Sequence, residues 1–244
     1  MLGMRHLKAS SDAWGSYSEK SVVFDYYPDA VYIEDDYTDE ENPYKLYESG
    51  DYWIEVSIDE SEIQLIWLTP DKCDEYEAEC MGKTQKTEEE LYTDAVEHLK
   101  QFVNIEYELE YDCIDEGITQ IFEIYEMRDG VQTGVGGRAA MLTDGILMGL
   151  SYENQRASES DYKNIIAGEQ AYSKAFDYLS KERRDLTVTA EDYSEENTRL
   201  QVEDGKYIYV VSFTGQREDG RSVACDVVIN AVNKKCFELI QRIK

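Results

Sequence analysis

The chain has 244 residues, and its 53 Asp and Glu against 24 Lys and Arg give a formal net charge of -29 at neutral pH. Such a surface repels phosphate backbones and anionic lipid headgroups, because binding either requires Lys and Arg to supply the attraction. We therefore expect neither nucleic-acid binding nor electrostatic docking to a membrane. The hydrophobic share of 42% and the aromatic share of 12% are too high for a disordered acidic tail, so the chain is expected to fold.

The sequence also lacks the usual membrane signals. Residues 1–11 carry Arg5 and Lys8 but no apolar core of about 7 to 15 residues, which a secretory signal has. No run of about 18 apolar residues is present that could span a bilayer. We expect no direct membrane insertion by this chain.

The five cysteines favour neither a zinc site nor a redox site. Their number is odd, and they form no C-x-x-C and no tight cluster with His. Cys225 shares strand parity with Val223 and Val227, as a small core residue would. We expect buried, unreactive thiols, with a disulfide between Cys73 and Cys80 as the alternative. The five are Cys73, Cys80, Cys113, Cys225 and Cys236.

Residues 1–85 are predicted to form a β-rich N-terminal region, because apolar and polar side chains alternate with a period of two. Asp59–Ser61 is the expected turn of a hairpin. The run Glu34–Glu41 has too much like charge to pack, and we expect a solvated loop there. The predicted strands are Val22–Tyr27, Val31–Glu34, Tyr52–Ile58 and Ile63–Trp67.

Residues 86–160 are predicted to start with an amphipathic helix. Thr87 and Glu90 have the spacing of a capping box, and one helical face carries Leu91, Ala95, Leu99 and Phe102. After this helix, apolar or aromatic residues alternate with acidic residues over Ile105–Asp112, which predicts a strand with one buried face and one face of carboxylates. Further strands are expected at 118–127, about 132–142 and about 145–152, with hairpin turns at Asp129-Gly130 and Asp144-Gly145.

Residues 161–244 repeat this plan. The helix positions Tyr92, Ala95 and Leu99 match Tyr172, Ala175 and Leu179. Strands are expected at 207–213, 221–229 and 235–241, with a turn at Asp219-Gly220. An internal duplication explains the match. We therefore predict an α+β fold, in which two repeated units of one helix packed on an antiparallel sheet follow the β-rich N-terminal region.

One stretch carries a family resemblance. Ile166–Leu179, Tyr207–Phe213, Asp219-Gly220 and Cys225–Lys234 together resemble a PepSY domain, which has a helix with paired alanines, a strand pair and a closing strand. The family's usual Asp-Ala-x-Thr-Gly turn is replaced here by Asn230–Lys234, with Asn for Asp and no Gly. The second copy would cover about residues 166–244, and residues 87–152 look like a diverged first copy.

The resemblance implies a non-catalytic bacterial module that binds or restrains other proteins. It implies no catalytic residues and no cofactor. It also implies a location outside the cytoplasmic membrane, with a signal or anchor that is absent from this chain. The alternative is a cytoplasmic location. The paired layout is similar to the extracytoplasmic parts of some sporulation and cell-wall regulators of Gram-positive bacteria.

No catalytic or nucleotide motif is supported by its surroundings. His98 lies beside the apolar helix stripe rather than on it, and neither His98 nor His6 has a converging nucleophile or metal ligand in the sequence. Gly82-Lys83-Thr84 has Glu77 where a phosphate-binding loop needs Gly. Gly134–Ala139 fits G-x-G-x-x-A, but Met141–Gly145 breaks any helix after it, so we expect a strand bulge or bend.

The carboxylates offer a weak case for a cation. Glu106, Glu108, Glu110 and Asp112 would lie about 6.6 Å apart on one strand face, which is too open to chelate one ion. We expect a solvated face. The Glu34–Glu41 loop could wrap a cation, and this alternative stays open. The abundant tyrosines of the first third fit strands, and they also fit interfaces.

These observations favour a non-enzymatic protein-interaction or regulatory module that acts through sheet edges and exposed aromatic residues. No catalytic residue, cofactor residue or metal ligand is predicted, and a protein partner is expected. Two alternatives remain. The first is an acidic ligand-binding or hydrolase domain with a cleft lined by two carboxylates of raised pKa, and the second is a cation-binding protein.

Overall fold

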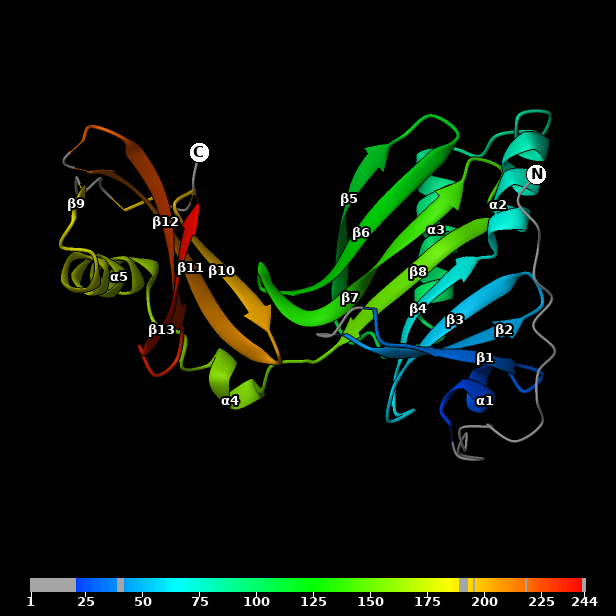
Figure 1. Ribbon diagram of the computed structural model, residues 1–244, viewed down its shortest axis with the longest axis horizontal. Helices are drawn as coiled ribbons and strands as arrows, with labels where there is room; N and C mark the ends of the chain where they lie inside the picture. Colours follow the sequence, from blue (N-terminus) through cyan, green and yellow to red (C-terminus); the bar gives the residue numbers. More distant parts are fainter. Residues whose placement is uncertain (1–20, 39–41, 189–192, 195, 218, 243–244) are drawn as a thin grey trace. The chain divides into compact units, whose positions relative to one another are not determined.

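The computed structural model describes residues 21–38, 42–188, 193–194, 196–217 and 219–242. Within these residues the protein is mostly β, with 46% strand and 22% helix, and its strands form antiparallel sheets of eight and five strands (Figure 1). The predicted α+β fold of two repeated helix-on-sheet units behind a separate N-terminal region is therefore wrong.

Runs of consecutive strands are separated by one or two helices. The helices are α1 (Val23–Tyr26), α2 (Pro70–Cys80), α3 (Glu88–Leu99), α4 (Glu159–Tyr162) and α5 (Gly168–Glu182). The first eight strands are β1 (Val31–Asp36), β2 (Tyr44–Ser49), β3 (Tyr52–Ser57), β4 (Ile63–Leu68), β5 (Glu108–Asp115), β6 (Thr119–Arg128), β7 (Val131–Leu142) and β8 (Leu147–Asn154). The last five are β9 (Leu186–Val188), β10 (Thr198–Glu203), β11 (Lys206–Arg217), β12 (Ser222–Asn230) and β13 (Cys236–Arg242).

The eight-stranded sheet explains why the fold prediction failed. Its order is β1-β2-β3-β4-β8-β7-β6-β5, so strands from the N-terminal region and strands from residues 108–154 belong to one sheet. The junction is an antiparallel ladder in which Ile66 pairs with Leu150 and Trp67 with Gly149. Alternation along a strand shows which side chains face the core, but it does not show which strand edges join.

Contact density divides the chain into two compact units. Unit 1 comprises the described part of Met1–Leu91 with Asp115–Gln120 and Ala139–Ser151, and unit 2 comprises the described parts of Tyr92–Ile114, Ile121–Arg138 and Tyr152–Lys244. Whether segments 1–85, 86–160 and 161–244 are domains stays a prediction.

The predicted hairpin in unit 1 is confirmed, and its neighbours differ from expectation. Strands β3 and β4 pair around a turn in which the Asp59 carboxylate accepts hydrogen bonds from the backbone and side chain of Ser61. The predicted strand Val22–Tyr27 is instead the short helix α1. Strand β2 was not predicted, although it pairs with both β1 and β3. The predicted Glu34–Glu41 loop starts later, because β1 continues to Asp36, and residues 39–41 lie outside the described part.

Helix α2 was also not predicted from the sequence, because most of its residues are charged and it lacks an apolar stripe. Pro70 occupies its first turn after the N-cap Thr69, which suits a residue without a backbone N–H. The thiols of Cys73 and Cys80 are free. They are separated by seven residues of helix, a rise of roughly 10 Å, which exceeds the Cα separation that a disulfide allows.

The capping box of α3 is confirmed. The Thr87 backbone N–H donates to the Glu90 carboxylate over 2.8 Å, and the Glu90 N–H donates back to the Thr87 hydroxyl over 3.3 Å. Both bonds satisfy groups that a helix start leaves without partners. Further along the helix, Leu91, Ala95 and Leu99 are fully buried, as predicted.

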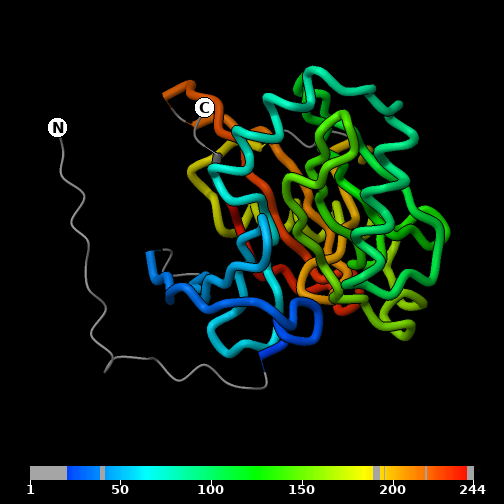
Figure 2. Tube along the Cα trace, turned by 90° about the vertical axis from the view of Figure 1, so that its right-hand side faces the viewer, coloured from blue at the N-terminus to red at the C-terminus, as the bar shows by residue number. Residues whose placement is uncertain are grey.

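In unit 2, α5 covers one face of the five-stranded sheet. The order is β10-β11-β12-β13, and β9 pairs with another part of β11. Ala171, Ala175 and Leu179 share one buried cluster with Val211 and Val227, so the small alanines let the helix lie close to the strands. Strands β11, β12 and β13 pair in that order, and Figure 2 traces this segment of the chain in orange and red in the turned view.

The matched helix positions have similar surroundings in spite of the different sheets. The ring of Tyr92 lies 6.1 Å from that of Phe122, and the ring of Tyr172 lies 5.3 Å from that of Phe213. At the turn Asn230–Lys234, the side-chain oxygen of Asn230 accepts backbone hydrogen bonds over 3.0 and 2.8 Å, as an Asp would.

Gly134 marks a close approach of backbone within unit 2. Its φ is +85°, and a Cβ added there would lie 2.5 Å from the Gln155 carbonyl oxygen and 2.6 Å from a methyl of Val202. The Gln155 N–H donates to the Gly134 carbonyl over 3.0 Å. Gly134–Ala139 thus lies inside strand β7, where the first glycine lets the chain after β8 run directly against the strand.

We predict that Gly134→Ala destabilises the protein by at least about 3 kcal/mol, because it adds overpacking against backbone to the cost of a positive φ. Gly117→Ala is the matched control: its φ is +87°, but nothing lies within 4 Å of an added Cβ. This control should lose only about 1 to 2 kcal/mol. Urea unfolding of both variants measures the difference, and equal losses would contradict the steric account.

Candidate functional site

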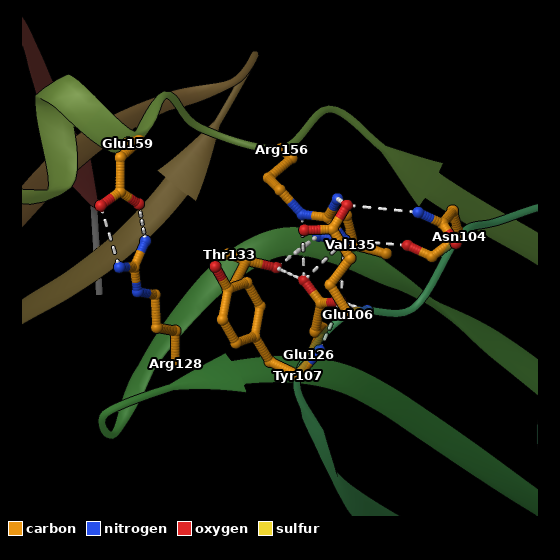
Figure 3. Close-up of polar contacts among 9 residues, drawn as sticks. All are labelled: Asn104, Glu106, Tyr107, Glu126, Arg128, Thr133, Val135, Arg156 and Glu159. Carbon is orange, nitrogen blue, oxygen red and sulfur yellow. Dashed lines mark hydrogen bonds and ion pairs between the residues drawn. The ribbon is translucent and has the colours of Figure 1, made fainter.

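The candidate site surrounds the β6–β7 hairpin of unit 2. The turn residues Asp129 and Gly130 have φ of 49° and 80°, as the predicted Asp-Gly hairpin requires. Strand β6 places Arg128 and Glu126 near the hairpin end, and the segment before β5 brings Glu106 and Tyr107 beside them (Figure 3).

Glu126 is a carboxylate without exposed surface at the base of this site. It lies on the buried face of β6, in parity with Phe122 and Ile124. One carboxylate oxygen accepts from the backbone N–H groups of Glu106, over 2.5 Å, and Tyr107, over 3.2 Å. The other accepts from the Thr133 hydroxyl over 2.6 Å. The carboxylate therefore fixes the chain just before β5.

Arg156 completes the partners of Glu126. Its guanidinium donates to both Glu126 oxygens over 2.8 to 3.2 Å. It also donates to the Glu106 carboxylate over 2.7 Å and to the Asn104 carbonyl over 2.8 Å. Arg156 follows β8, so this cluster joins three parts of the chain that are far apart in sequence (Figure 3).

The protonation of Glu126 follows from these contacts. Burial raises the pKa of this carboxyl, but the hydrogen bonds from Thr133, the Glu106 amide and Arg156 together lower it below its usual value. The carboxylate stays ionised and has donors on both oxygens. A general acid or base needs a proton that it can exchange with substrate, so this arrangement suits structural anchoring.

Arg128 forms a second contact set at the hairpin end. Its guanidinium forms a bidentate pair with Glu159. It also lies 4.2 Å from the ring centroid of Tyr162 and 5.2 Å from that of Tyr107, so two aromatic rings contact one cation. The Tyr162 hydroxyl donates to Asp129 over 2.9 Å. These contacts hold α4 against the hairpin.

An open groove of about 740 Å³ runs along the β5 side of the hairpin. Four carboxylates and only one guanidinium line this groove, and Tyr107 and Met127 provide apolar surface. The lining residues are Glu106, Tyr107, Glu108, Glu110, Met127, Arg128, Asp129 and Gly130. Such a surface favours positively charged groups.

The structure separates the four carboxylates predicted to share one strand face. Glu108, Glu110 and Asp112 are exposed on β5, as expected. Glu106 precedes the strand and pairs with Arg156, because Glu126 holds that segment by its backbone. Asp112 accepts from the Tyr125 hydroxyl, and burial together with this bond raises the pKa of Tyr125 to about 12.

The site residues missed from the sequence are Glu126, Thr133, Arg128, Arg156 and Glu159. The sequence contained a signal for Glu126. This acidic residue continues the alternate positions of Phe122 and Ile124, which face the core in a predicted strand. Nothing in the sequence pointed to Arg156 as its partner, since thirty residues separate them.

The other candidate residues lie elsewhere. His98 is half-buried on α3, and burial lowers its pKa while Asp94 opposes the shift. His6 lies outside the described part. Lys83 of the Gly82-Lys83-Thr84 sequence pairs with Asp144 over 3.0 Å. Of the cysteines, Cys80 and Cys225 are buried and the other three are half-buried.

Glu55 in unit 1 bears on the hydrolase alternative. Burial raises the pKa of its carboxyl, while a hydrogen bond from the Trp67 indole lowers it. Hydrogen bonds from the side chain and backbone of Thr38 lower the pKa of the nearby Asp36 carboxyl. These neighbours thus shift in opposite directions, whereas the alternative expects two raised values.

Within the described residues, no group of three or more His, Cys, Asp or Glu side chains is arranged to hold a metal ion. No helix in that part of the chain is long and apolar enough to cross a membrane.

No protein-family model matches the chain, and a search of curated proteins also found no match. The PepSY resemblance therefore stays a prediction.

We predict a pH-dependent contribution from Glu159. Its hydrogen bonds with Arg128 and Lys163 lower its pKa from 4.5 to about 2. A carboxyl with a lowered pKa in the folded state stabilises fully above its unfolded pKa, and this contribution is lost as the pH falls from about 4.5 to about 2. Wild type should be more stable than Glu159→Gln at pH 7, and the gap should close over this window.

Urea unfolding between pH 7 and pH 2 measures this gap. The control is Glu153→Gln, an exposed strand residue, which should show no such gap. A gap for Glu159→Gln that persists unchanged to pH 2 would exclude the ion pair as its cause.

Proposed function

We propose that this protein is a non-enzymatic protein-interaction module that binds its partners through the terminal strands of its sheets. The observation that carries the proposal is the location of the exposed large apolar side chains. Among the described residues, every exposed large hydrophobic side chain within a strand lies on a terminal strand. They are Val31 and Ile33 on β1, Ile114 on β5, and Phe237 and Ile240 on β13.

A terminal strand presents backbone N–H and C=O groups on its outer side, and an extended peptide can pair with them. Apolar side chains beside that edge add contact area, so they suit a partner strand rather than water. Phe237, with 51% of its surface exposed, is the most exposed aromatic residue among the described strand residues. The resemblance of about residues 166–244 to PepSY domains supports the same proposal, since that family is non-catalytic.

Selection of random peptides on the whole chain tests this function. Phage-displayed 12-residue peptides should yield binders, and binding should weaken at least tenfold in one of three variants, V31S/I33S, I114S or F237S/I240S. Met81→Ser is the matched control, because Met81 is exposed but lies outside the strands.

Three results would contradict the proposal. The first is a selection that yields no binders, and the second is a set of binders that none of the three edge variants weakens. The third is turnover of a peptide or glycoside that is lost on changing a single polar residue.

A further inference from the structure

Among the terminal strands that carry exposed large apolar side chains, β1, β5 and β13, strand β5 has the most regular alternation of exposed and half-buried residues. The register of β1 shifts between Tyr32 and Glu34, and the register of β13 shifts so that Phe237 has no partner on β12. Irregularities of this kind in an edge strand hinder the pairing of a further strand. Strand β5 has eight residues, and exposed and half-buried side chains alternate along it without interruption from Glu108 to Ile114.

The two faces of β5 have different chemistry. Leu109, Tyr111 and Cys113 are half-buried, and the ring of Tyr111 stacks on that of Tyr92 of α3 with centroids 4.0 Å apart. Glu108, Glu110 and Asp112 are exposed on the opposite face. A strand added at this edge would therefore place alternate side chains beside a row of carboxylates and the rest toward α3.

The charge of this row selects the kind of strand that can pair. A second copy of β5 would place carboxylates opposite carboxylates, which is destabilising in a cross-strand pair. Lys or Arg at alternate positions would instead lie opposite the three carboxylates. The acidic groove also favours positively charged side chains. It extends beyond the start of β5, where Glu106 and Asp129 line it.

We propose that β5 binds an extended, basic segment of another protein as an additional β-strand, with alternate Lys or Arg side chains facing Glu108, Glu110 and Asp112. This inference rests on the proposed function and specifies its edge and its partner chemistry. The anchoring of residues 106 and 107 by Glu126 fixes the start of the edge, so the strand is ordered before the partner arrives.

Two synthetic peptides of equal composition and charge provide the probe, capped KVKVKVKV and capped KKKKVVVV. Only the first presents Lys at alternate positions of a strand. We expect the full chain to bind it at least tenfold more tightly by isothermal titration calorimetry at physiological salt. The comparison is necessary because a chain with a net charge of -29 attracts any cationic peptide.

Hydrogen exchange locates the peptide. Binding of KVKVKVKV should slow amide exchange in the segment 108–115, since the amides that point to the outer side of β5 would enter a new ladder. The E108K/E110K variant should bind at least tenfold more weakly. The control D74K/E153K makes the same change in sign at exposed positions of α2 and β8 and should bind as wild type does.

Equal affinity for the two peptides, unchanged exchange in 108–115, or equal effects of the two double variants would each overturn the inference. A separate failure of the proposed function remains distinguishable. If selected peptides lose binding in V31S/I33S or F237S/I240S but not in E108K/E110K, the module binds by another edge, and only the β5 inference fails.

Discussion

The buried carboxylate of Glu126 is the constraint on which the candidate site depends. A buried ionised carboxylate is costly unless donors replace its water, and here a hydroxyl, two backbone N–H groups and a guanidinium do so. Because those donors come from the segment before β5, from β7 and from the chain after β8, one charge orders three remote segments. Without Arg156, the Glu126 charge would lack its counterion.

This anchoring links the core of unit 2 to its surface. Glu126 holds Glu106 and Tyr107 by their backbone, so β5 starts at a fixed place beside the groove. Arg128 stabilises the same end of the hairpin through Tyr107 and Tyr162. A strand edge with one anchored end loses less conformational freedom when a partner strand pairs with it, which favours binding.

Much of the local structure could be predicted from the sequence, because it depends on near neighbours. The capping box at Thr87 and the alternation of Tyr52–Ile58 follow from spacing alone. The fold class could not, since the pairing of β4 with β8 joins residues about 85 positions apart and no pattern within either strand specifies it. Helix α2 was missed because its mostly charged sequence has no apolar stripe.

The site was harder to predict than the fold. A carboxylate at core parity marked Glu126 as unusual. Its donors are two backbone N–H groups, the Thr133 hydroxyl and the distant Arg156, and none of them has a local sequence signal. Likewise, the exposed carboxylates of β5 were visible as a strand face, whereas their place on a terminal strand depends on the order of the whole sheet.

Amide exchange in Glu126→Gln, compared with wild type at pH 7, tests the central claim most directly. The account predicts faster exchange at Glu106 and Tyr107 and in the first residues of β5, because the amide side chain loses the charge that these donors and Arg156 share. Exchange in β11 and β12 should stay unchanged. Unaltered exchange at residues 106–110 would contradict the claim that this buried carboxylate holds the edge in place.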